Sequence, residues 1–176
     1  MRSGAGGGVA PSELERRLIE SAELTEVTGK LIEDVTAELH PPMLDEYGLA
    51  AALRWFGEQQ AVRTGLRIDV QAPQSGAPAP RPERDLALFR IAQEALNNVV
   101  KHAHARHVNI TLIDDPRRLV LSVRDDGRGL DAESETHGRA RFGRRGMRER
   151  ALAIGAELEI VPAEGGGTVV RVRVAP

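Results

Sequence analysis

Apolar side chains recur along this chain with two different periods, and the two periods predict where its helices and strands lie. Alternating apolar and polar positions predict strands near residues 66–70, 108–112, 119–123, 158–161 and 169–174. Apolar positions at helical spacing predict helices over about residues 12–39, 43–63, 83–103 and 146–154. This order favours an α+β fold, a two-layer α/β sandwich in which helices cover one face of a mixed sheet and a helical stub precedes it.

Glycine and proline positions divide the chain into three parts. Residues 1–11 are rich in glycine, and we expect them to be disordered. Residues 12–40 open with a capping-box pattern and carry an apolar stripe close to heptad spacing. That stripe needs either the following domain or a second copy of itself to be buried. The Pro-Pro pair ends this helix, so residues 41–176 form the main domain.

The charge balance and the absence of cysteine exclude several kinds of site. A formal net charge of −2 over 176 residues argues against nucleic-acid binding by bulk phosphate attraction. Without cysteine, disulfides and thiolate metal sites are excluded. No run approaches the roughly 18 apolar residues of a membrane span, and the glycine-rich start is not a signal region. We therefore expect a cytoplasmic protein, or a soluble part of a larger one, without membrane contact.

The helix predicted over residues 83–103 carries an acid and an amide that can act together. Glu94 and Asn98 are four positions apart, so both point from the same helix face. An amide oxygen is a neutral hard ligand suited to Mg²⁺, and a carboxylate one turn away can accept a proton or orient a water. Taken alone, the pair fits a solvated helix surface better than it fits a site.

An aspartate stands where the strand near residues 119–123 meets a glycine-rich turn. Asp125 is followed by Gly127 and Gly129. A carboxylate at this place can accept a hydrogen bond from an exocyclic amine such as that of adenine, and the glycines let the backbone come close to a ligand. An acidic hairpin turn is the simpler reading. The loop runs on for some fifteen residues before the next predicted helix, however, and such long loops are often lids.

Two further glycine clusters complete the candidate site. Gly143 and Gly146 lead into the helix predicted from residue 146, and backbone N–H groups at a helix N-terminus bind phosphate oxygens. No Gly-Lys-Ser/Thr follows, so this is not a P-loop. The glycines before Thr168 fit either a simple β-turn or a close approach to a ligand loop. Residues 126–145 lack periodicity, and we expect them to be mobile. Arginines near these glycines form either a solvated face or a phosphate contact: Arg141, Arg144, Arg145, Arg148 and Arg150.

Together these segments resemble the ATP-binding domain of sensor histidine kinases, within the wider group that includes gyrase B, Hsp90 and MutL and shares the Bergerat fold. In particular the chain resembles the kinase subfamily that pairs with response regulators of the nitrate-response type. The matching segments are the N box at residues 93–103, the G1 box at 125–129, the G2 region at 143–150, the Gly-Gly-Thr at 166–168 and the domain junction at 38–49.

The resemblance implies a role for each residue of the N box that was singled out. Asn98 would coordinate Mg²⁺, and Glu94 would be the catalytic acid/base residue beside it. Lys101 and His102 would lie near the phosphates and the ribose of ATP. These roles rest on the positions that match the family motif.

The resemblance likewise implies that the glycine-rich segments form the rest of the ATP site. Asp125 would recognise the adenine amine, and the glycines of the G1 and G2 segments and Thr168 would shape the pocket. Residues 131–145 would be the ATP lid. Two features depart from the family pattern: Arg144 replaces the usual aliphatic residue after the first G2 glycine, and the lid carries Arg139 and Arg141.

By the same resemblance, the chain is the Mg·ATP-binding part of a histidine kinase that moves the γ-phosphoryl group to a histidine. His40 lacks the context of an acceptor because Pro41 and Pro42 follow it. We therefore expect the acceptor on a dimerisation domain that this chain lacks. The implied partners are that domain and a cognate response regulator, in a full-length homodimer, which is either membrane-bound or soluble.

Two other functions fit the same binding residues. An anti-sigma-factor serine kinase of related fold would phosphorylate a protein partner, but it would not need the helix and Pro-Pro junction at residues 24–49. A non-enzymatic, ATP-gated interaction module would signal its nucleotide state through the lid. Binding residues alone do not separate these alternatives from phosphoryl transfer to histidine.

Overall fold

The computed structural model describes residues 42–73, 81–115, 117–129 and 139–174. The predicted glycine-rich tail, the helix over residues 12–40 with His40, and the first part of the predicted lid lie outside the described residues. The described part belongs to a single compact unit that begins at Pro42. No helix within it is both long and apolar enough to cross a bilayer.

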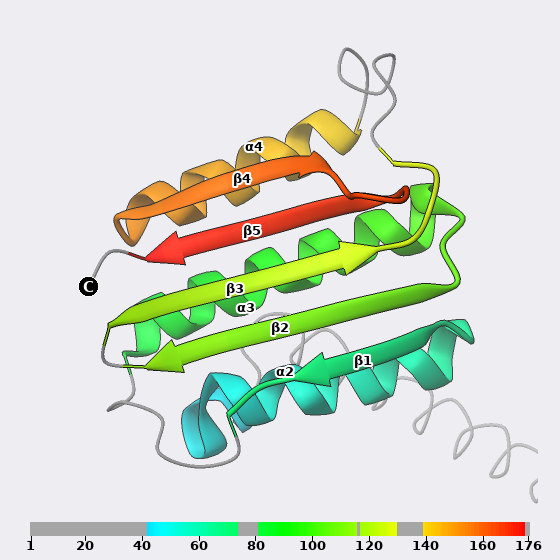
Figure 1. Ribbon diagram of the computed structural model, residues 1–176. Coiled ribbons are helices and arrows are strands. Elements are labelled where there is room, and N and C mark those ends of the chain that lie inside the picture. Colours follow the sequence, from blue (N-terminus) through cyan, green and yellow to red (C-terminus); the bar gives the residue numbers. More distant parts are fainter. Residues whose placement is uncertain (1–41, 74–80, 116, 130–138, 175–176) are drawn as a thin grey trace, which may run out of the picture. The chain divides into compact units, whose positions relative to one another are not determined.

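A five-stranded mixed sheet forms one layer of the domain, with strand order β1-β2-β3-β5-β4 (Figure 1). Only β1 and β2 run parallel, and all the other neighbouring pairs are antiparallel. The strands are β1 (Arg67–Gln71), β2 (His107–Asp115), β3 (Arg118–Asp125), β4 (Ala156–Pro162) and β5 (Thr168–Val174). The predicted mixed sheet is confirmed; β2 to β5 contain the alternating runs that predicted them, and β1 begins one residue after the start of its run.

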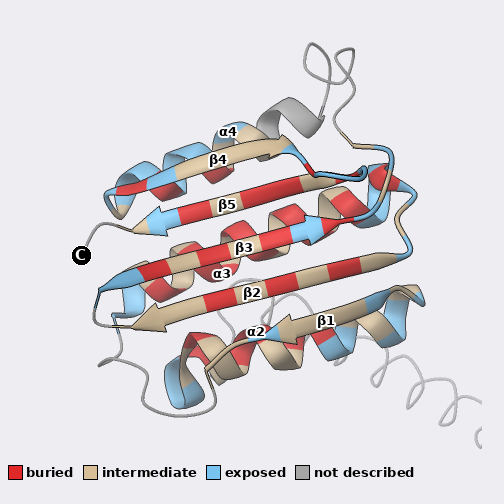
Figure 2. Ribbon diagram, in the orientation of Figure 1, coloured by how far each residue is buried: buried red, intermediate tan, exposed pale blue. Residues whose placement is uncertain are grey.

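The second layer consists of helices that all lie on one face of the sheet (Figure 1). They are α2 (Pro42–Thr64), α3 (Pro82–Asn98) with the π-helical turn η1 (Val99–Ala103), and α4 (Arg139–Ala153). The central helix α3 buries Leu88, Ile91 and Leu96 completely against the sheet, since these residues repeat at helical spacing. Figure 2 shows the buried positions along the strands and helices. The two-layer α+β arrangement is therefore as predicted.

The start of α4 differs from the prediction. The helix predicted from residue 146 begins at Arg139, so the last part of the segment expected to be irregular is helical. Glycine weakens a helix by about 1 kcal/mol relative to alanine, which is why the sequence around Gly143 and Gly146 suggested a helix start. Packing outweighs this penalty, because Met147 and Ala151 of α4 are buried in the core. Both glycines lie inside the helix.

Two local features of the other helices were not predicted. Gly48 interrupts α2 with φ 78° and ψ 175°, a backbone conformation that is essentially restricted to glycine. The long helix predicted to end near residue 103 changes from α to π geometry at Val99.

The strand β2 also runs further than expected. Asp114 and Asp115 pair with Leu119 and Arg118.

Candidate nucleotide site

Asp125 lies at the end of β3, where the strand alternation turns its side chain toward the helical layer. It follows Leu121 and Val123 at a spacing of two, and it is only 4% exposed. Its Oδ1 accepts the Gly127 N–H at 2.8 Å, and its Oδ2 accepts the Thr168 N–H at 3.1 Å. Burial raises the pKa of Asp125, and these two hydrogen bonds oppose that increase. The carboxylate thus joins the G1 turn to the start of β5.

Two glycines in this region are required by close backbone contacts. A Cβ on Gly127 would overlap the Ala103 carbonyl oxygen, and a Cβ on Gly167 would overlap the Asp125 carbonyl oxygen. Gly167 also has φ +89°, in the region that side chains rarely adopt. Gly129 faces the Gly167 backbone, so the G1 turn and the β4–β5 turn lie against each other. The structure therefore brings together Asp125, both G1 glycines and Thr168, as the sequence predicted.

A second aspartate, Asp126, stabilises this turn through hydrogen bonds, and the sequence analysis did not identify it. Asp126 Oδ1 accepts the N–H groups of Arg106 and His107 at 2.8 and 2.9 Å, which fixes the start of β2. These bonds, that of His107 first, lower the pKa of Asp126. The Arg128 N–H donates to the Ala103 carbonyl at 2.9 Å. The Asp-Asp doublet at a strand end was the available signal, because aspartate often accepts nearby backbone N–H groups.

Glu94 and Asn98 meet on the last turns of α3, as their spacing predicted. Asn98 Nδ2 lies 3.5 Å from Glu94 Oε1, and both side chains are half-buried. Gly143 of α4 packs directly on the carboxylate, because a Cβ there would overlap Glu94 Oε1. A Cβ on Gly146 would meet only the flexible end of Arg150 at 2.9 Å. In this structure Gly143 is thus a contact with Glu94 inside a helix, and the predicted helix N-terminus is not at these glycines.

Lys101 and His102 follow Asn98 in the π-helical turn η1, and both are exposed. Neither side chain forms a hydrogen bond or ion pair with another of the residues described. The turn ends at His104, which has a left-handed φ of 51°. Because π-turns inside helices are frequent at functional sites, this geometry marks the same end of α3 as the Glu94–Asn98 pair.

The described residues contain no cluster of three or more acidic or histidine side chains able to hold a metal ion by themselves. The Glu94–Asn98 pair supplies two oxygen-bearing side chains only. That donor set fits an ion such as Mg²⁺, which prefers oxygen ligands, uses one or two protein groups and keeps several waters. It does not fit an ion that needs a complete protein cage.

The fold and the buried aspartate between two glycine turns define the class of this domain, an α+β nucleotide-binding domain of the ATPase and kinase kind. The family model of the histidine kinase-, DNA gyrase B-, and HSP90-like ATPases matches residues 83–176. The chain belongs to this family. The matched segment contains every candidate site residue from Glu94 to Thr168.

Sensor histidine kinases are among the proteins whose sequences resemble this chain. It is 33% identical over 155 residues to the sensor histidine kinase ComP of Bacillus subtilis (strain 168), covering 88% of this chain and 20% of ComP. It is 37% identical over 142 residues to the sensor histidine kinase MctS of Rhizobium johnstonii, covering 80% of this chain and 30% of MctS. The chain therefore spans less than a third of the length of these two relatives.

Solved structures give the same assignment. The histidine kinase domain of the blue-light activated kinase from Erythrobacter litoralis EL346 matches with a TM-score of 0.60 and 25% identity, over 72% of this chain and 60% of that one. The Acinetobacter baumannii histidine kinase AdeS matches with a TM-score of 0.55 at 12% identity, over 97% of this chain and 87% of that one. The second likeness concerns the fold alone. The domain is of the histidine kinase ATP-binding type.

Proposed function

We propose that this chain is the Mg·ATP-binding catalytic part of a two-component sensor histidine kinase, of the subfamily that pairs with nitrate-response-type regulators. The observation that carries the proposal is the Asp125 carboxylate, buried and held by the Gly127 and Thr168 N–H groups. The family membership and the named sensor kinases among its relatives support it.

Adenine recognition is assigned to Asp125. Each carboxylate oxygen has two lone pairs, and each uses one of them for a backbone N–H, so acceptor capacity remains for the exocyclic amine. Guanine presents a carbonyl oxygen at the corresponding place, and two acceptors facing each other repel. Gly127, Gly129 and the turn before Thr168 then shape the pocket by letting the backbone approach the ligand.

The phosphate end of the site is assigned to the C-terminal end of α3. Asn98 would hold Mg²⁺, which supplies neutralisation of the phosphate charge when bound. Glu94, 3.5 Å from the Asn98 amide, would accept the proton of the attacking group. Lys101 and His102, exposed on η1, would contact the phosphates and ribose. Gly143 and Gly146 would contribute through α4 and the lid.

The whole protein would transfer the γ-phosphoryl group to a histidine on a dimerisation domain, and from there to a cognate response regulator. Residues 12–40 would be the end of that dimerisation domain, residues 41–176 the catalytic domain, and the full-length kinase a homodimer with its catalytic part in the cytoplasm. The sensor kinases among its relatives favour this over an anti-sigma-factor serine kinase or an ATP-gated module.

A transfer experiment in trans tests the proposal. Labelled ATP and Mg²⁺ are incubated with the chain and a separate acceptor-helix fragment from a kinase of this subfamily. We expect acid-labile phosphate on the fragment, lost with Glu94→Ala or Asn98→Ala and kept with Asn109→Ala on the other face of the sheet. Acid-stable phosphate on serine would support the serine kinase instead. ATP binding without any transfer would support the ATP-gated module.

A further inference from the structure

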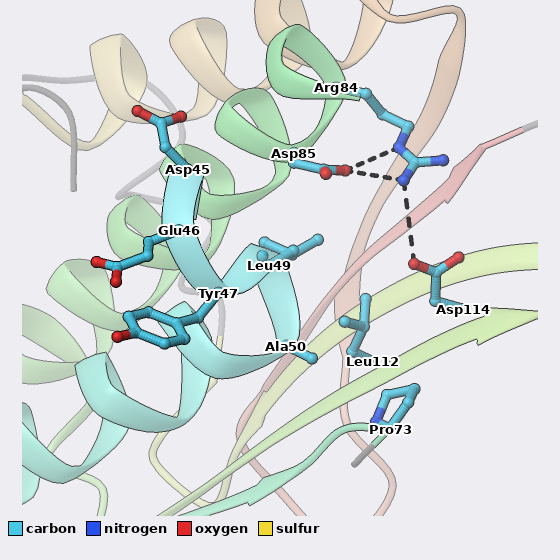
Figure 3. Close-up of a pocket in the computed structure, with 11 residues that line it drawn as sticks. Asp45, Glu46, Tyr47, Leu49, Ala50, Pro73, Arg84, Asp85, Leu112 and Asp114 are labelled. Atoms are coloured by element: carbon cyan, nitrogen blue, oxygen red, sulfur yellow. Dashed lines mark hydrogen bonds and ion pairs between the residues drawn. The ribbon is translucent and has the colours of Figure 1, made fainter. Parts of the chain in front are cut away.

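A cavity of about 230 Å³ opens at the end of α3 opposite to the candidate nucleotide site. It is enclosed by the first turns of α2, the start of α3 and the end of β2 (Figure 3). Asn98 ends α3 at one side of the domain, whereas Arg84 and Asp85 stand in its first turn. Because a helix rises about 1.5 Å per residue, the two places lie on the order of 20 Å apart.

One side of the cavity is a buried ion pair between Arg84 and Asp85. Arg84 donates to Asp85 Oδ1 from Nε at 2.9 Å and from Nη2 at 2.8 Å. Asp85 Oδ2 accepts the Arg81 N–H at 3.2 Å, and the Asp85 N–H donates to the Arg81 carbonyl at 2.9 Å. Asp85 therefore caps the start of α3 and is neutralised by its neighbour. This pair leaves no charge for a ligand.

Asp114 faces the same cavity without comparable support. It follows Leu112 at a spacing of two on β2, so its side chain points to the helical layer, and only 8% of that side chain is exposed. It forms an ion pair with Arg84, with Oδ2 and Nη2 4.0 Å apart, beyond hydrogen-bond distance (Figure 3). Among the described residues, no donor reaches either oxygen of this carboxylate. Burial raises the pKa of Asp114; the positive charge of Arg84 opposes that increase, and the negative charge of Asp85 adds to it.

The rest of the cavity has the chemistry of a channel for an aliphatic stem. Leu49, Ala50, Pro73 and Leu112 supply apolar lining next to the Asp114 carboxylate. At the outer side, Tyr47 is 59% exposed, and the Glu46 carboxylate lies beside it, whereas the Asp45 carboxylate points away from the ring (Figure 3). The residues of the lining include four carboxylates and one guanidinium, which forms ion pairs with Asp85 and, at longer distance, with Asp114.

We propose that this cavity is a binding site for a guanidinium or primary ammonium group on an aliphatic stem, with Asp114 as the residue that accepts its hydrogen bonds. The stem would contact the apolar lining, and the aromatic face of Tyr47 suits a cation at the entrance. A basic side chain of a protein partner and a free alkylamine both present this chemistry. The proposal does not depend on nucleotide binding, because the cavity lies at the other end of α3.

The test uses small probes on the full chain. Nα-acetyl-arginine amide carries a single guanidinium, Nα-acetyl-citrulline amide has the same shape without charge, and agmatine represents the free alkylamines. Binding is followed by the backbone amide NMR shifts of Leu49, Ala50 and Leu112. We expect saturable shifts with the two cations and none with citrulline. The cation that binds more tightly identifies the natural ligand as either a protein side chain or a free amine.

Two variants and a matched control separate a binding role from a structural one. Asp114→Asn should weaken both cations at least about tenfold, since it removes the charge-assisted hydrogen bond. Ala50→Leu should block them by filling the cavity without changing any charge. Glu157→Gln, which removes one carboxylate on the other face of the sheet, should bind as the original chain does. ATP affinity should stay the same in all three. Equal shifts with citrulline, or undiminished binding by both Asp114→Asn and Ala50→Leu, would overturn the proposal.

Discussion

Asp85 and Asp125 are both buried, with 6% and 4% of each residue exposed, and they stand at opposite ends of the same domain. Asp85 meets a guanidinium and a backbone N–H, whereas Asp125 meets two backbone N–H groups and no cation. A carboxylate paired with a guanidinium is neutralised within the fold. A carboxylate held by neutral donors keeps its charge and part of its acceptor capacity. The difference separates an aspartate that serves stability from one suited to bind a ligand.

The largest effect on stability is expected at Asp85. Asp85→Asn leaves the Arg84 guanidinium, whose side chain is only 12% exposed, without its carboxylate. Removing one member of a buried ion pair costs about 3 kcal/mol of unfolding free energy. Chemical denaturation measures the change, and Glu58→Gln on the exposed side of α2 should change it by less than about 0.5 kcal/mol. The ATP affinity of Asp85→Asn should equal that of the original chain. A loss of affinity in a folded Asp85→Asn protein would remove the distinction between the two aspartates.

The substitution of Asp125 is expected to weaken nucleotide binding rather than to destabilise the fold. Asp125→Asn removes a charge-assisted hydrogen bond to adenine, which should cost roughly 1.5–3 kcal/mol of ATP binding free energy. Calorimetric titration with ATP and GTP measures it. Asp126→Asn is the matched control, because Asp126 contacts the start of β2. Equal affinities of the original chain for ATP and GTP, or an unchanged Asp125→Asn protein, would contradict the adenine assignment.

A smaller effect is expected where the phosphates would bind. Asn98→Ala should abolish the enhancement of ATP binding by Mg²⁺, because it removes the amide oxygen next to Glu94, while the contribution of adenine remains. Titrations with and without Mg²⁺ in both proteins measure this. Asn109→Ala, on β2, should behave as the original chain does. If Mg²⁺ enhances binding equally with and without Asn98, this residue is not a ligand.

The smallest effect concerns pH and follows from the raised pKa of Asp125, which burial causes. A raised pKa means that the folded chain takes up this proton at a higher pH than the unfolded chain does. The contribution of Asp125 to stability is therefore fully present at low pH and is lost as the pH rises through the folded pKa. Adenine recognition needs the ionised form, so ATP affinity should change in the opposite direction.

Denaturation and ATP titration between about pH 4 and pH 7 test this opposition, with Asp125→Asn as the reference for all other titrating groups. The difference in unfolding free energy between the original chain and the variant should shift in favour of the original chain as the pH falls. The difference in ATP affinity between the original chain and the Asp125→Asn variant should become smaller over the same pH range. Parallel changes of the two quantities would show that Asp125 is not the group that meets adenine.

The sequence predicted the sheet and most of the candidate site because both depend on local spacing. Alternation placed Asp125 on the inner side of β3, and a spacing of four brought Glu94 to Asn98. The start of α4 could not be predicted in this way. It depends on the burial of Met147 and on the contact of Gly143 with Glu94, which join segments almost fifty residues apart.

The residues that the sequence analysis missed depend on contacts between segments. Asp126 accepts hydrogen bonds from N–H groups some twenty residues earlier in the chain. The Ala103 carbonyl accepts the Arg128 N–H, and these two residues are also far apart in the sequence. Asp114 stands in an Asp-Asp-Pro-Arg segment, a sequence typical of turns. The strand pairing of Asp114 with Leu119 extends β2 and turns the carboxylate inward. No local pattern marks such an inward charge.

The edge of the sheet at β4 has a consequence for how the domain behaves in concentrated solution. An edge strand offers its unpaired backbone to other chains, and proteins commonly protect such edges with charge and proline. Here Glu159 is held by Arg171 at 3.2 Å and by Arg173 at 3.1 Å across the outer face, and the strand ends at Pro162, which has no N–H to donate. A strand of a second molecule that extended the sheet at β4 would have to pack next to these charged side chains. It also could not accept a hydrogen bond from the Pro162 nitrogen, which carries no hydrogen. The edge at β4 is thereby protected against strand-to-strand aggregation.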